Sequence, residues 1–133
     1  MLGIGVLAAL VVAQSGAAPL PACSGNAAAI DSVANNDVQN NGDTERYALR
    51  GTVTNHGTRK QAPKVLQSVE VYQDGEKINE IGIPPLGAGR SYTFRQGVVR
   101  SVIAGEGTTH LVFRLEMHKP QNCAEGSAYR LRV

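Results

Sequence analysis

The sequence predicts an all-β fold, a seven-stranded antiparallel β-sandwich of the immunoglobulin or fibronectin type III kind. Apolar and polar residues alternate along several short segments, which is typical of half-buried strands. Turn-forming residues separate these segments at intervals of about 8 to 15 residues, as in a sandwich. No segment after the first thirteen residues has a helical period. Because tryptophan is absent, the Cys-Trp-Cys pattern of antibody domains is missing, and the fibronectin-like variant fits better.

The composition indicates one folded domain. The chain has 133 residues, of which 42% are hydrophobic and 18% are charged. The formal net charge of +2 is too small to indicate nucleic acid or a charged membrane surface as a partner. The basic pair Arg59-Lys60 is therefore interpreted as solvated surface.

Residues 1–22 are predicted to be a secretory signal peptide that is cleaved between Ala13 and Ala22. The stretch MLGIGVLAALVVA carries no charged side chain and is followed by small and polar residues. It is too short for a membrane span, which needs about 20 apolar residues. No Lys or Arg precedes it, so either the α-amino group supplies the positive charge or the true start lies upstream. We expect residues 23–133 to form a periplasmic or secreted domain without a transmembrane segment.

Cys23 and Cys123 are predicted to form a disulfide, because such bonds persist after export. Strand counting places both at the pole where the first strand begins and the sixth ends. Closing a loop of about 100 residues contributes about 4.7 kcal/mol in the chain-entropy model. The alternative treats LPAC, residues 20–23, as a lipoprotein cleavage site with a lipid on Cys23.

The first half of the domain begins with a weak strand at 26–33 and a polar loop at 34–45. The stretch RYALRGTVTN, residues 46–55, alternates strictly. Its expected inner face is Tyr47, Leu49, Gly51 and Val53. Its expected outer face is Ala48, Arg50, Thr52 and Thr54.

Residues 65–83 predict a β-hairpin, since Asp74-Gly75 is a strong hairpin signal. A two-residue loop there sets Val71 opposite Ile78. Ile81 and Ile83 fall on the opposite face of the strand from Ile78 if it alternates regularly, which predicts a bulge near Asn79 or Glu80.

The second half of the domain starts with PPLGAG, residues 84–89, which ends the preceding strand. A short strand is expected at SYTF, residues 91–94, and a short apolar piece and a Gly-rich turn at 97–109. HLVFRLEM, residues 110–117, alternates most clearly of all. A loop is expected at 119–127 and a last strand at 128–133. The predicted core comprises Val53, Val71, Phe94, Leu111, Phe113 and Leu115.

The order of TVTNHGT, VEVYQDGEKI, IPPLGAGRSYTF and GTTHLVFRLE resembles the CARDB family, the cell adhesion related domain found in bacteria. The resemblance covers about residues 30 to 133. This chain differs from the usual family pattern in its weaker first strand and in the stretch PQNCAEGS before the last strand. The resemblance implies a seven-stranded sandwich with an accessory role outside the cytoplasm, and it implies no catalytic residues.

The three histidines do not predict a catalytic or metal site. Asn55 and Gly57 both tolerate positive φ, so His56 between them is interpreted as an exposed residue of a tight corner. His110 and His118 lie on one face of a strand about 26 Å apart, too far to share a metal ion. The segment 37–43 has Gly where a Ca²⁺ loop needs it but lacks the bidentate Glu, so a solvated turn is favoured.

The remaining charged residues are interpreted as surface. Glu70 and Glu80 flank the hairpin as ordinary surface carboxylates. Five arginines are expected on the outer sheet faces, where they pair with nearby Glu or bind an acidic glycan or protein: Arg50, Arg95, Arg114, Arg130 and Arg132.

The sequence therefore predicts a non-enzymatic module for binding or adhesion at the bacterial envelope. Its partner is expected to be a protein or a glycan, and no cofactor, metal or nucleic acid is expected. One alternative is a structural or assembly subunit that pairs through an edge strand. Another is a small periplasmic inhibitor or hydrolase, and proximity of His, Asp and Ser side chains would favour the hydrolase.

Overall fold

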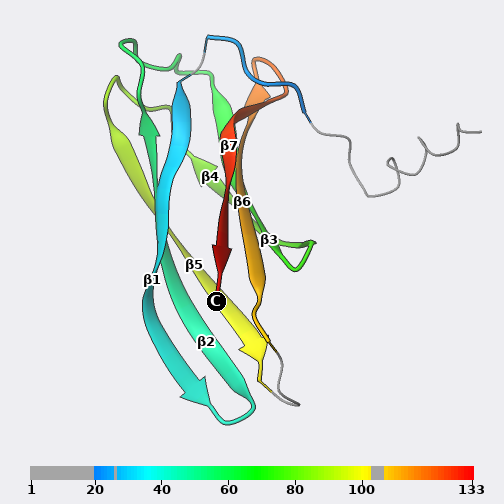
Figure 1. Cartoon of the computed structure of the whole chain (residues 1–133). Helices are drawn as coiled ribbons and strands as arrows, with labels where there is room; N and C mark the ends of the chain where they lie inside the picture. The colour runs from blue at the N-terminus through cyan, green and yellow to red at the C-terminus, as the bar shows by residue number, and fades with distance from the viewer. Residues whose placement is uncertain (1–19, 26, 103–106) are drawn as a thin grey trace, which may run out of the picture.

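The computed structural model describes residues 20–25, 27–102 and 107–133 and shows a sandwich of two antiparallel sheets (Figure 1). The seven strands are β1 (Ala28–Asn41), β2 (Thr44–Asn55), β3 (Leu66–Gln73), β4 (Glu76–Ile83), β5 (Ser91–Ser101), β6 (His110–Lys119) and β7 (Cys123–Arg132). One sheet has the order β1-β2-β5, and the other has the order β4-β3-β6-β7. The predicted fold class is confirmed. The signal-peptide prediction falls almost wholly outside the described residues.

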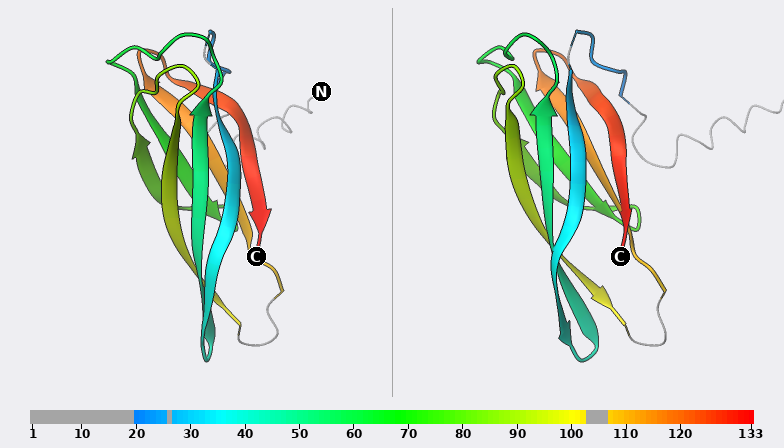
Figure 2. Two further views of the ribbon diagram at one scale, coloured as in Figure 1. Left: turned by 90° about the vertical axis from the view of Figure 1, so that its left-hand side faces the viewer. Right: turned by 60° about the vertical axis from the view of Figure 1, so that its left-hand side comes forward.

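The two sheets pack face to face around an aliphatic core (Figure 2). All six predicted core residues are buried, and Val53, Val71, Leu111 and Phe113 are fully so. Along β6 the burial alternates as predicted, with Leu111, Phe113, Leu115 and Met117 inside. No helix in the described part of the chain is long and apolar enough to span a bilayer.

The two phenylalanines meet in the middle of the core. Phe94 of β5 and Phe113 of β6 have ring centroids 6.0 Å apart and tilted planes, a favourable aromatic geometry. Gly51 is paired with Phe94, and a Cβ at Gly51 would lie 2.1 Å from that ring. Glycine is needed there because the ring occupies the space of a side chain.

The prediction of a polar loop at 34–45 is wrong, because this segment is a β-hairpin that extends beyond the second sheet (Figures 1 and 2). β1 pairs with β2 as far as Asn41 and Thr44. Gly42 has a φ of 73°, which suits the first position of a two-residue hairpin turn. Pairing with β2, itself paired with β5 as far as Thr44, outweighs the low strand propensity of asparagine.

The β3–β4 hairpin has the predicted turn but a different register. Asp74 and Gly75 have φ values of 49° and 88°, as a type I′ turn requires. The bulge falls at Ile78, one residue before the predicted position, so Val71 pairs with Asn79. Ile78 is then the unpaired residue and is partly exposed.

β5 and β7 are longer than predicted. β5 continues from the SYTF segment to Ser101, because every one of its residues pairs with β2. Residues 123–127, predicted as a loop, belong to β7, and only residues 120–122 connect it to β6. An irregularity in the β6–β7 register near Gly126, which has a φ of 70°, accommodates the polar sequence.

Candidate functional site

The predicted disulfide between Cys23 and Cys123 is present, with the Cα atoms 5.0 Å apart. Cys123 is the first residue of β7, and its side chain is buried against Val65 and Met117. The bond holds the N-terminal segment against β7, where Ala22 forms a parallel bridge with Ala124. The Cys23 amide donates to the Ala124 carbonyl at 2.9 Å. One pole of the sandwich is thereby closed.

The corner at Asn55 lies at the same pole as the disulfide. The prediction that positive φ at Asn55 and Gly57 forms this corner is wrong. Neither Asn55 nor Gly57 has a positive φ. Instead, the buried Asn55 amide donates from Nδ2 to the carbonyls of Arg59 and Leu86 at 2.9 and 3.0 Å. Its Oδ1 accepts from the Gly57 amide at 2.9 Å. One side chain therefore fixes two loops.

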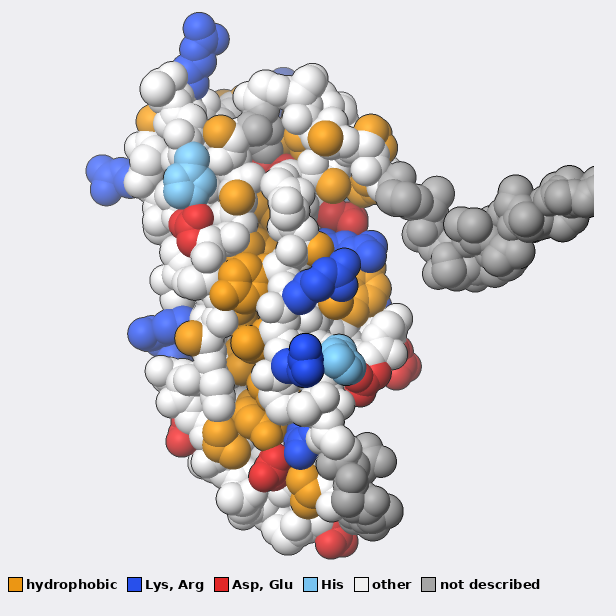
Figure 3. All heavy atoms as spheres, in the orientation of Figure 1, with side chains coloured by type: hydrophobic (Ala, Val, Ile, Leu, Met, Phe, Trp, Pro, Cys, Tyr) orange, Lys and Arg blue, Asp and Glu red, His pale blue; other side chains and the backbone are white. Residues whose placement is uncertain are grey.

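A groove of about 420 Å³ lies between these two fixed regions, and we call it the cationic groove. Its walls comprise Ser24, Gly25, Ala27, Asn55, Gly57, Thr58, Arg59, Lys60, Gln61, Ala62, Val65, Met117, Pro120 and Gln121. None of these lining residues carries a carboxylate. Lys64 and Lys119 adjoin the walls in sequence, and Lys and Arg side chains project from this end of the molecule (Figure 3).

The cations around the groove take part in none of the ion pairs within the described part of the chain. Arg59, Lys60, Lys64 and Lys119 are exposed. Arg59-Lys60 was interpreted as solvated surface from the sequence, because only the tertiary structure shows that the described residues lining the groove include no Asp or Glu.

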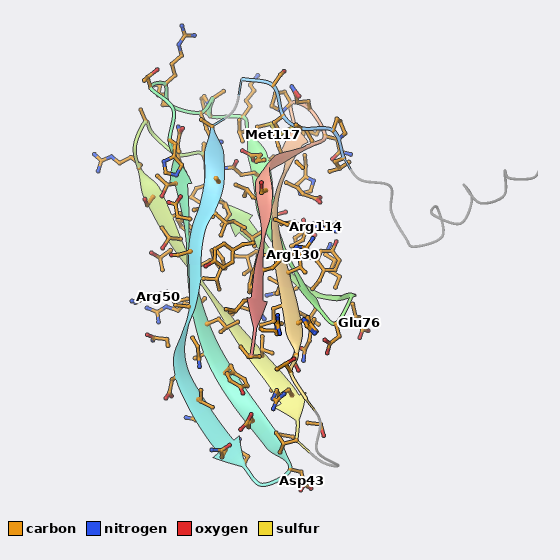
Figure 4. The ribbon with its side chains drawn as sticks, in the orientation of Figure 1. Asp43, Arg50, Glu76, Arg114, Met117 and Arg130 are labelled. Carbon is orange, nitrogen blue, oxygen red and sulfur yellow. A yellow bond between two sulfur atoms is a disulfide. The ribbon has the colours of Figure 1, made fainter. Side chains whose placement is uncertain are left out.

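His56 is exposed, as predicted, and lies beside the corner. Its Nε2 is 2.6 Å from Oδ1 of Asp31 on β1. The described residues contain no group of three or more side chains able to hold a metal ion. The polar segment 37–43 lies in the β1–β2 hairpin, with Asp43 at its tip (Figure 4).

His118, Ser68 and Glu80 meet on the outer face of the four-stranded sheet, with a glutamate where the hydrolase hypothesis expected an aspartate. The Ser68 hydroxyl lies 2.8 Å from both His118 Nε2 and Glu80 Oε2. Glu80 Oε2 is 3.3 Å from the same Nε2. In a catalytic triad the carboxylate instead contacts the other imidazole nitrogen and so orients the ring. The three side chains are close together without having that relay order.

The carboxylate of Glu80 is held in its ionised form. Hydrogen bonds from Lys77 at 2.8 Å and from Ser68 lower the pKa of Glu80 below its usual value. An ionised carboxylate that accepts two hydrogen bonds serves as a structural acceptor here.

Glu70 is not an ordinary surface residue, which corrects its predicted role. It lies directly opposite Glu80 in the β3–β4 ladder and is 9% exposed. Lys77 bridges the two carboxylates, at 3.2 Å from Glu70 and 2.8 Å from Glu80. Tyr72 also donates to Glu70, at 2.7 Å. The lysine offsets the repulsion between two like charges that face each other.

The five arginines singled out in the sequence all lie exposed on outer faces. Arg50 and Arg95 are on the three-stranded sheet. Arg114, Arg130 and Arg132 are on β6 and β7. Figure 4 shows Arg50 on the opposite side of the sandwich from Arg114 and Arg130. The expected ion pairs with Glu do not form among the described residues, and the Arg114 guanidinium instead lies 5.1 Å from the centre of the Tyr72 ring.

Glu125 is a buried carboxyl that the sequence did not single out. It lies on β7 two residues after Cys123, is paired with Leu115 and is 2% exposed. Neither of its carboxyl oxygens has a hydrogen-bond partner in the described structure. Burial raises its pKa from the ordinary 4.5 to about 7. Glu125 lies two residues after Cys123, so alternation along a strand places both side chains on the same inner face. That spacing is the only sequence signal that could have identified it.

Glu125 should make the domain less stable as the pH rises. The unfolded chain releases this proton near pH 4.5, whereas the folded domain keeps it until about pH 7. The stabilising contribution is therefore complete below pH 4.5 and is lost as the pH rises to 7. Two and a half pKa units correspond to about 3 kcal/mol. Urea unfolding of the native protein and Glu125→Gln at pH 4 to 8 should show a difference that changes by this amount. A constant difference would contradict it.

No protein-family model matches the sequence, and no curated protein resembles it significantly. Similar solved structures include Bacteroides uniformis β-glucuronidase 2, with 16% identity, a TM-score of 0.46, and coverage of 74% of this chain and 12% of that chain. A putative β-galactosidase from Bacteroides fragilis has 15% identity, a TM-score of 0.46, and coverage of 80% and 16%. Northeast Structural Genomics Consortium target SoR45 has 13% identity, a TM-score of 0.42, and coverage of 79% and 86%. The chain thus matches less than a fifth of the length of either glycosidase.

Proposed function

We propose that the protein is a non-catalytic binding module of the bacterial envelope, and that the cationic groove holds its protein or glycan partner. The observation that carries this proposal is a groove of about 420 Å³ with basic residues on its walls and no carboxylate. The disulfide fixes one side and the Asn55 amide fixes the other. A site whose walls are held in place loses little conformational entropy when it binds.

The location at the envelope is supported by the disulfide, since such bonds are rare in the cytosol. The predicted signal peptide and the resemblance to the CARDB family support the same location and an accessory role. The adhesion role and the family assignment stay predictions.

A hydrolase is less well supported, because Glu80 and Ser68 both contact the same nitrogen of His118. The assembly alternative has a specific observation in its favour. β1 is an edge strand, and its segment 34–41 carries Asp37 as its one charged residue. A concentration-dependent dimer that Val38→Pro abolishes, measured by light scattering, would support assembly instead.

Reversing two charges of the groove should weaken binding to the envelope. The variant Arg59→Glu/Lys60→Glu leaves the buried Asn55 network intact, because Arg59 takes part in it through its backbone carbonyl. We expect its retention on isolated bacterial envelopes to fall about tenfold or more, which corresponds to about 1.4 kcal/mol. Cosedimentation measures the bound fraction.

Arg130→Glu/Arg132→Glu is the matched control, since it makes the same change of charge on exposed residues of β7. Retention of this control should stay close to that of the native protein. Equal losses in both variants would show a general charge effect, and equal retention would exclude the groove.

A further inference from the structure

Arg50 and Arg95 are directly opposite each other on β2 and β5. Both are exposed on the outer face of the three-stranded sheet. Like charges at this position of an antiparallel ladder repel each other. Glu70 and Glu80 on the other sheet have the same arrangement, but there Lys77 bridges them. The described residues provide no ion-pair partner for either arginine.

A small hollow lies beside the two arginines. It measures about 180 Å³ and is lined by Asn36, Ala48, Leu49, Arg50, Arg95, Gln96 and Gly97. Ala48 and Gly97 are the next outward pair of the same ladder, and a Cβ at Gly97 would meet nothing within 4 Å. The two smallest side chains thus leave room in front of the two guanidinium groups.

The surrounding charges favour an anion in this hollow. Arg46, also exposed, points outward from β2 one pair further along. The acidic side chain of the neighbourhood is Asp37, which is paired with Ala48. Asp31, nearer the disulfide pole, is already engaged with His56. Around the hollow, the positive charges of Arg46, Arg50 and Arg95 therefore outnumber the single negative charge of Asp37.

The rest of this face favours a glycan over a protein. Beyond the arginines toward the disulfide pole, the next outward pair is Thr52 with Thr93, and Ser32 lies opposite Thr52 on β1. Hydroxyl groups of this kind hydrogen-bond to sugar hydroxyls. Val99 is the one large apolar side chain among the described residues that is exposed on this face, whereas a protein interface usually has an apolar or aromatic centre.

We propose that Arg50 and Arg95 form a subsite for the carboxylate groups of an acidic glycan. Guanidinium groups match a carboxylate with two parallel hydrogen bonds, and the Asn36 amide lies at the same hollow. The bound anion removes the repulsion between the two arginines. The subsite lies on a sheet face, goes beyond the cationic groove and does not depend on it.

The test is a titration of the full disulfide-bonded protein with oligogalacturonate, followed by NMR or calorimetry. Arg50→Gln/Arg95→Gln should weaken binding about tenfold or more, since two exposed charge-assisted contacts are lost. Asp37→Asn should strengthen binding, and added salt should weaken it. The methyl-esterified oligosaccharide, which has the same sugars without the charge, should not bind.

The groove variant Arg59→Glu/Lys60→Glu separates this subsite from the cationic groove, because it should bind oligogalacturonate as the native protein does. Unchanged affinity in the Arg50→Gln/Arg95→Gln variant would overturn the proposal, as would no binding by the native protein. Equal affinity for polyglutamate of the same length would overturn the choice of a glycan. A thermal melt of each variant confirms that the domain is folded.

Discussion

Phe113→Ala should lower the free energy of unfolding by about 3–5 kcal/mol, the cost of a cavity left by a large aromatic side chain. Phe113 has no exposed surface and lies on β6 between Val71 of β3 and Tyr129 of β7. Its ring also contacts Phe94 of the opposite sheet. The loss therefore weakens the packing between the sheets, and urea unfolding measures it.

Thr93→Ala is the matched control for Phe113→Ala. Thr93 is exposed on the outer face of β5, so its replacement should cost less than about 0.5 kcal/mol. Thr54, which the strand pattern also places outward, is unsuitable because it is 9% exposed and its hydroxyl lies 2.7 Å from that of Ser91. Similar losses for Phe113→Ala and Thr93→Ala would contradict the assigned faces.

Replacing Cys23 and Cys123 by alanine should destabilise the domain by about 2–5 kcal/mol. The bond closes a loop with a sequence separation of 100 residues, so it restricts the unfolded chain strongly. In the folded state it keeps residues 21–23 against Ala124. Chemical unfolding of the oxidised protein, the reduced protein and the double variant measures the effect, and the last two should agree.

Alkylation without reductant tests the same bond in the native protein. We expect neither Cys23 nor Cys123 to be labelled. Labelling of Cys123, together with a diacylglycerol mass on Cys23, would instead establish the lipoprotein alternative.

The strands that the sequence predicted best are those with one face in the core. β6 alternates from Leu111 to Met117 because its inner side chains pack between the sheets. The β1 half of the β1–β2 hairpin carries no such signal, since residues 34–41 are exposed on both faces. Its extended form results from pairing with β2, which is a tertiary effect.

Of the site, the sequence could predict only the disulfide, because cysteine is the residue type that forms such a bond. Two cysteines in a chain predicted to be exported imply a bond, and strand counting located it. The contact between Ser68 and His118 depends on the β3–β6 register, which no local pattern encodes. Arg50 and Arg95 meet for the same reason, because β2 and β5 are separated in sequence by the β3–β4 hairpin.

The disulfide also decides how the domain transmits mechanical force. Tension between the N-terminal segment and Val133 passes from Cys23 through the sulfur atoms directly into Cys123. Strands β1 to β6 lie within the covalent loop and outside the path of the load. Peeling β7 from β6 can therefore release only residues 123–133, about 40 Å of chain, whereas the same chain without the bond could extend by about 400 Å. Under load the disulfide-bonded domain can therefore extend only slightly.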